Sequence, residues 1–127
     1  MSQDRKPFMA LHDEITQWKS NVELVRSEIS TFQKQLSEIA RKNNHEDVMK
    51  GIEHFQNQFT RHLEVSDELM HNLHAADHEL AEKAKKVGNS DKIFIKENAG
   101  LRGQAEIYNK LFLELKNEFH LFLEKWM

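Results

Sequence analysis

The sequence predicts an all-α fold, an elongated antiparallel three-helix coiled-coil bundle. The 127 residues include only four glycines and one proline, too few for the many turns of a sandwich or barrel. Apolar residues recur at alternating spacings of three and four along most of the chain, which is the heptad pattern of helices packed side by side. Short polar segments near residues 43 and 89 divide this pattern into three stretches. A chain of this length fits one domain, residues 1–127.

The first helix is expected over residues 7–42. Pro7 suits a first helical turn, where its missing N–H is not needed. Arg41 and Lys42 complement the negative end of the helix dipole, and Asn43 favours a stop. The core-facing positions are all apolar: Phe8, Leu11, Ile15, Trp18, Val22, Val25, Ile29, Phe32, Leu36 and Ile39.

The second helix is expected over residues 45–87. Asn44 is typical of an N-cap, and Gly88 of a C-terminal stop. The core-facing positions are apolar except for two polar residues one turn apart, His62 and Ser66. The full set is Val48, Ile52, Phe55, Phe59, His62, Ser66, Leu69, Leu73, Ala76 and Leu80.

The third helix is expected over residues 91–126, with Ser90 as its cap. Gly100 and Gly103 fall inside it, and each costs about 1 kcal/mol relative to alanine. We therefore expect a helix bent at the glycines, and the alternative is a helix that begins near residue 101. The core-facing positions are Phe94, Asn98, Leu101, Ala105, Tyr108, Phe112, Leu115, Phe119, Phe122 and Trp126.

Short connections make successive helices antiparallel. Folding the chain at residues 43 and 89 brings Phe32, Phe55 and Trp126 to the same level at one end of the bundle. Large aromatic side chains are therefore expected to pack together there.

This pattern resembles the spectrin repeat. The likeness lies in three heptad helices of this length, in Trp18 midway along the first, and in Phe55, Phe59 and His62 in the second. It spans residues 8–126. The resemblance implies a spectrin-like three-helix fold, and we take no cytoskeletal role from it.

The composition excludes several classes of protein. Without cysteine there is no disulfide, thiolate metal site or thiol nucleophile. With 18 basic and 21 acidic residues the net charge is −3, which is not typical of a nucleic-acid-binding protein. No apolar run approaches the roughly 18 residues of a membrane span, and the N-terminus lacks the apolar core of a signal peptide. We expect a cytoplasmic protein without a cofactor.

Three of the eight histidines form a stripe on the second helix: His71, His74 and His78. Two imidazoles at i, i+4 can hold one metal ion on a helix surface. The stripe faces away from the core, so two interpretations stay open: a solvated polar face, or a metal-binding or metal-sensing bundle. A hemerythrin-like di-iron site is set aside, because no carboxylate occupies a core-facing position.

The polar pair His62 and Ser66 is expected to be a buried layer that fixes the register of the helices. Tyr108 and Asn98 are expected at other levels and out of reach, which leaves backbone or water as partners. The facing positions supply no acid or nucleophile, and this argues against an enzyme. A cavity beside this layer would instead indicate a small-molecule carrier.

The third helix offers the best functional signal. It carries more apolar residues than one buried stripe needs, and an exposed apolar patch commonly marks a partner surface. We therefore expect a non-enzymatic interaction or scaffold protein, whose partner is a second copy of the chain or another protein. The expected docking face is Ile107, Leu111, Leu113, Leu121 and Leu123.

Overall fold

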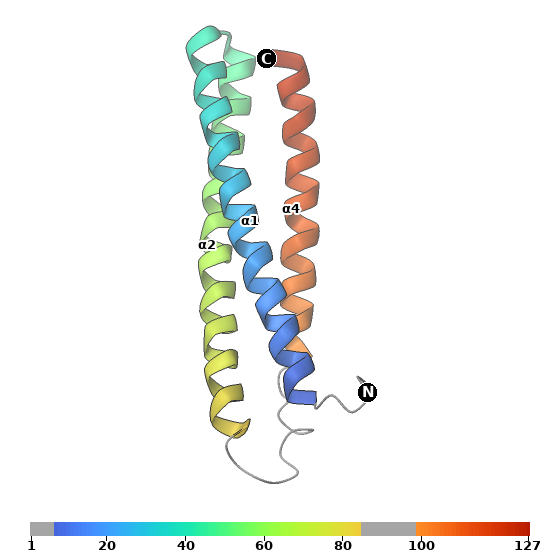
Figure 1. The fold of residues 1–127 in the computed structure, drawn as a ribbon. Helices are drawn as coiled ribbons and strands as arrows, with labels where there is room; N and C mark the ends of the chain where they lie inside the picture. Colours follow the sequence, from blue (N-terminus) through green and yellow to red (C-terminus); the bar gives the residue numbers. More distant parts are fainter. Residues whose placement is uncertain (1–6, 85–98) are drawn as a thin grey trace.

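Three long helices pack side by side in a computed structural model that describes residues 7–84 and 99–127. They are α1 (Pro7–Lys42), α2 (Glu46–Ala84) and α4 (Ala99–Trp126). Helix α2 runs antiparallel to both neighbours, and the end of α4 lies beside the turn between α1 and α2 (Figure 1). The described ranges contain no strand, which confirms the predicted three-helix bundle. Within them, no helix is long and apolar enough to cross a membrane.

The described ends of the first two helices lie close to the predicted boundaries, and the predicted end of the second helix, residues 85–87, lies outside the described residues. Helix α1 has the predicted bounds, 7–42. It is closed by Asn43, whose side-chain Nδ2 donates to the carbonyl oxygen of Ile39 at 3.0 Å. Helix α2 begins one residue later than predicted, because the carbonyl of His45 accepts the first helical hydrogen bond, from the N–H of Met49 at 3.1 Å.

The third helix is described only from Ala99 onward. The predicted stretch 91–98 lies outside the described residues, and so do Phe94 and Asn98. Helix α4 is uninterrupted through Gly100 and Gly103, which lie in its first two turns.

The core is formed by the heptad positions identified in the sequence, except that the side chains of Phe8, Phe94 and Asn98 lie outside the described part of the chain. Trp18, Phe122 and Trp126 are half-buried at its edge, and two core-facing side chains on α2 are polar. Burial of this apolar surface supplies most of the stabilisation of such a bundle. The buried core-facing residues are Leu11, Ile15, Val22, Val25, Ile29, Phe32, Leu36, Ile39, Val48, Ile52, Phe55, Phe59, His62, Ser66, Leu69, Leu73, Ala76, Leu80, Leu101, Ala105, Tyr108, Phe112, Leu115 and Phe119.

Polar side chains bridge α1 and α4 at a constant offset of 88 residues. The pairs repeat every seven residues on both helices, so the two helices run parallel in a fixed register. The pairs are Glu14–Arg102 at 2.7 Å, Asn21–Asn109 at 3.4 Å and Glu28–Lys116 at 2.9 Å. The backbones of α1 and α4 approach each other less closely than either approaches α2, so these long side chains span the gap.

The register corrects one expectation about the aromatic core. The ring of Phe32 contacts those of Phe119 and Phe59, with centroids 5.0 and 5.9 Å apart. The offset of 88 places Phe32 level with residue 120, well before Trp126. The predicted level of Phe32, Phe55 and Trp126 was therefore wrong.

A glycine in α2 allows α4 to approach closely at its C-terminal end. A Cβ atom added to Gly51 would overlap the aromatic ring of Phe122, with Cε1 as its nearest atom. The Phe122 ring also packs against Phe55, with centroids 5.1 Å apart. Gly51 thus provides the space into which this ring packs.

Candidate functional site

A buried polar cluster joins α2 to α4 near the middle of the bundle. The hydroxyl of Ser66 donates to the carbonyl oxygen of His62, one turn earlier, at 2.9 Å. The hydroxyl of Tyr108 lies 2.6 Å from the same Ser66 Oγ. Because the single hydroxyl proton of Ser66 is used by the carbonyl, Tyr108 is the donor in the second bond. The exposed fractions are 6% for His62, 0% for Ser66 and 2% for Tyr108.

The contact between Tyr108 and Ser66 was not expected from the sequence. Folding the chain at residue 89 places Ser66 level with Phe112, one turn beyond Tyr108. In the structure α2 and α4 pair one turn away from that register, so the two hydroxyls meet. The expectation that Tyr108 could not reach the polar pair was wrong.

The imidazole of His62 packs among aromatic rings. It stacks on Tyr108 with centroids 4.5 Å apart, and it packs at a tilt against Phe112 with centroids 5.6 Å apart. Burial disfavours the charged form and lowers the pKa of His62 below its ordinary value of 6.5. Its Nε2 atom is buried and has no hydrogen-bond partner among the described residues.

This arrangement does not activate a nucleophile. The Ser66 hydroxyl bonds a carbonyl and a tyrosine, and neither bond is to the His62 imidazole. A serine nucleophile needs a hydrogen bond to a general base. The geometry instead favours a structural role for the cluster, fastening α4 to α2.

A groove runs along the outside of α2 and α4, above this cluster. It consists of two adjoining hollows of about 220 and 340 Å³ that share Val65 and Leu111. Tyr108 lines the first hollow and His62 the second, so the polar cluster lies at the floor. We call this surface the α2–α4 groove. It is lined by Gln58, Arg61, His62, Val65, Glu68, Leu69, Asn72, Gln104, Ile107, Tyr108, Leu111, Glu114, Leu115 and Glu118.

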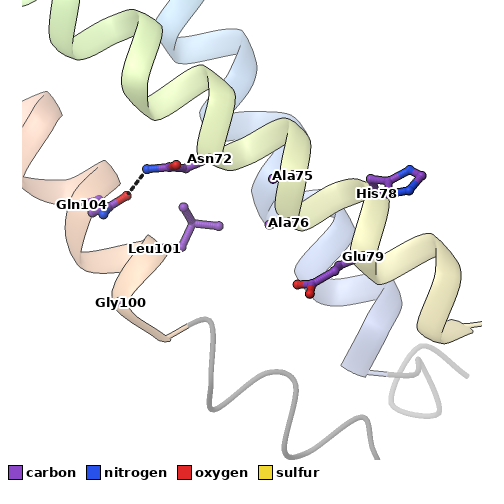
Figure 2. A pocket seen from close by; sticks show the side chains of 8 residues that line it. All are labelled: Asn72, Ala75, Ala76, His78, Glu79, Gly100, Leu101 and Gln104. Atoms are coloured by element: carbon purple, nitrogen blue, oxygen red, sulfur yellow. Dashed lines mark hydrogen bonds between the residues drawn. The ribbon is translucent and has the colours of Figure 1, made fainter.

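A further hollow continues the groove toward the start of α4. Figure 2 shows Asn72 and Gln104 facing each other across the two helices, joined by a hydrogen bond of 3.3 Å. Leu101 points into the space between them and His78, whereas the imidazole of His78 points away from α4 (Figure 2). The bond between the two amides therefore crosses the groove near one end.

The structure divides the five apolar residues of the expected docking face. Ile107 and Leu111 line the groove and are 60% and 49% exposed. Leu113 is 48% exposed, but the 100° turn per residue places it about 160° around the helix from Leu111. Leu121 is 67% exposed and lies nearer the C-terminal end, and Leu123 is half-buried against the core. The five residues do not form one surface.

The α2 wall of the groove was missed in the sequence analysis. Val65, Glu68 and Asn72 recur at three- and four-residue spacing beside the core-facing stripe. That spacing was available in the sequence, but the residues are of mixed polarity, so no apolar period marks them. Only their position beside Ile107 and Leu111 shows that they form a wall.

The histidine stripe is exposed on the outside of α2. His71, His74 and His78 all face solvent, and His71 borders a shallow hollow with Asp67 and Glu68. Among residues 7–84 and 99–127, no three His, Asp or Glu side chains are arranged to hold a metal ion. The geometry of the stripe thus gives no support to the metal-binding interpretation.

Comparison with known proteins adds no relative. No family model, no curated protein and no solved structure matches this chain. The resemblance to spectrin repeats therefore stays a prediction.

Proposed function

We propose that this protein is a non-enzymatic helical bundle that acts by binding a helix of another protein in the α2–α4 groove. The observation that carries the proposal is the exposure of Ile107 and Leu111 along one wall of that groove. Apolar side chains gathered at a concave surface favour a binding role over a solvated one.

The groove has the dimensions of a helix-binding site. It lies between two antiparallel helices, where an additional helix would produce a four-helix arrangement. From Gln58 to Asn72 it extends about 21 Å, or four helical turns. Partner helices commonly bind such grooves through apolar residues on one face.

Two leucines of α4 provide a matched pair for the test. Leu111 and Leu113 are 49% and 48% exposed, yet only Leu111 lines the groove. A photo-crosslinking amino acid is introduced at either position, and the protein is irradiated in the cells that produce it. We expect a discrete crosslinked adduct from position 111 and none from position 113, with mass spectrometry identifying a different protein.

Three outcomes would contradict the proposal. They are adducts of equal yield from both positions, no adduct from position 111, and an adduct that contains only a second copy of this chain. The charged variant Leu111→Lys extends the test, since it should abolish the adduct formed from a crosslinker at Ile107. Leu113→Lys should leave that adduct unchanged.

A further inference from the structure

We infer that the helix bound in the α2–α4 groove is cationic and amphipathic, with lysine or arginine residues flanking its apolar face. This inference rests on the proposed function and specifies its partner.

The groove is acidic along both walls. Glu68 stands on α2, and Glu114 and Glu118 stand on α4. Among the residues that the structure describes, Arg61 is the one lysine or arginine that lines the two hollows. The Arg61 guanidinium lies 3.7 Å from the carboxylate of Glu64, which partly neutralises it. The acidic side chains therefore dominate the potential over the groove.

Two of these carboxylates have charge available for a partner. Neither Glu68 nor Glu114 forms an ion pair with another described residue. They lie at opposite ends of the shared apolar section formed by Val65 and Leu111. A bound helix would thus meet apolar surface at its centre and negative charge on both sides.

This charge pattern disfavours a second copy of the chain as the occupant. A two-fold dimer presents the same patch from both subunits. In such a dimer, acidic walls would face acidic walls, and like charges brought together at an interface are unfavourable. A helix with basic flanks is complementary to the same surface.

The recognition pattern follows from the spacing of the groove residues. Apolar residues at i, i+3 or i+4, and i+7 of the partner would pack on Val65, Ile107 and Leu111. Basic residues beyond the two ends of this apolar stretch would reach Glu68 at one end and Glu114 at the other. The apolar face supplies affinity, and the basic flanks supply selectivity and faster association.

The test uses two synthetic helical peptides of about three heptads. Both carry the same leucine and alanine face, and they differ only in having lysine or glutamate at the flanking positions. Binding of each fluorescein-labelled peptide to the full chain is measured by fluorescence anisotropy at about 50 mM and about 500 mM salt. We expect the lysine peptide to bind at least about tenfold more tightly at low salt, and this advantage to shrink at high salt.

A double variant tests whether the groove carboxylates are responsible. Glu68→Gln/Glu114→Gln should weaken binding of the lysine peptide by about tenfold at low salt. The control Glu53→Gln/Glu124→Gln removes the same charge from exposed positions that do not line the groove, and it should change binding less than twofold. Circular dichroism verifies that both variants keep the helical content of the parent.

These experiments distinguish a failure of the cationic partner from a failure of helix binding itself. Equal binding of the lysine and glutamate peptides, both lost in Leu111→Lys, would overturn the cationic partner and leave helix binding intact. Equal weakening by the two double variants would also overturn the role of the groove carboxylates. Failure of both peptides to bind would count against helix binding itself, as would binding unaffected by Leu111→Lys.

Discussion

Tyr108 donates a hydrogen bond of 2.6 Å to Ser66 across the interface of α2 and α4, and Ser66 in turn donates one to the backbone carbonyl of His62 in α2. The two hydroxyls are buried, and both donors are satisfied: Tyr108 donates to Ser66, and Ser66 donates to the carbonyl of His62. Burial raises the pKa of Tyr108 above its ordinary value of 10.0, which keeps the phenol protonated as a donor.

This direction of donation predicts unequal costs for two similar deletions. Ser66→Ala leaves the buried Tyr108 hydroxyl without its acceptor and should lower the free energy of unfolding by about 1–3 kcal/mol. Tyr108→Phe leaves Ser66 bonded to its carbonyl and should cost about 0.5–1.5 kcal/mol. Urea unfolding of the single and double variants checks the order, and a double variant as costly as the sum of the singles would contradict the coupling.

The buried His62 predicts loss of stability in acid. Its pKa is lowered from 6.5 by burial, so the unfolded chain binds a proton more readily than the folded one. The contribution of neutral His62 is therefore fully present above about pH 6.5 and is lost progressively as the pH falls below it. Urea unfolding between about pH 7.5 and about pH 5 should show that the free energy of unfolding falls more steeply with decreasing pH for the parent than for His62→Gln. Equal slopes would show that His62 does not cause the effect.

The two kinds of glycine site predict opposite effects of alanine. Gly103→Ala meets nothing within 4 Å and should stabilise the helix by up to about 1 kcal/mol. Gly51→Ala places a methyl group against the ring of Phe122 and should destabilise the bundle by about 1–3 kcal/mol. Thermal unfolding of the two variants is the measurement. An increase in thermal stability in both variants would mean that the ring of Phe122 moves aside without cost.

The ion pair between Glu28 of α1 and Lys116 of α4 predicts that exchanging its two charges restores the stability lost in a single charge reversal. Glu28 and Lys116 are 2.9 Å apart and each about 30% exposed. Glu28→Lys alone should cost about 0.5–1 kcal/mol, and Glu28→Lys/Lys116→Glu should recover most of that loss. The same exchange at Arg61 and Glu64, an exposed pair 3.7 Å apart within α2 and away from its ends, should change little. Chemical unfolding at low salt checks both, and failure of the exchange to recover stability would argue against the bridge.

Much of the helical core could be predicted from the sequence because helical periodicity is a local property. The three- and four-residue spacing fixes which face of each helix is apolar, whatever its neighbours are. His62 and Ser66 were placed in the core on this basis, despite their polarity, and they are buried. The bounds of α1 followed in the same way, from Pro7 and the basic residues of its last turn.

The register between the helices could not be predicted from the sequence in the same way. A heptad stripe looks the same after a shift of one turn, so the stripe of α4 does not specify which of its residues faces Ser66. The expected register excluded Tyr108, and side-chain packing selected it, with the ring of Phe122 against Gly51 at one end. The exposed apolar residues of α4 were likewise predicted to form one face. The sequence shows that α4 has more apolar residues than one buried stripe needs, but it does not show which of them lie beside α2.

The sequence by itself determined that this protein is a bundle of long amphipathic helices and which side chains each helix buries, because those properties depend on neighbours within one or two turns. The tertiary structure decided the register between helices, the partner of the buried serine and the division of the α4 leucines into groove and non-groove positions. These depend on steric fit between residues far apart in the chain, where a shift of one turn changes few apolar contacts and only the combined packing of large, small and polar side chains distinguishes the alternatives.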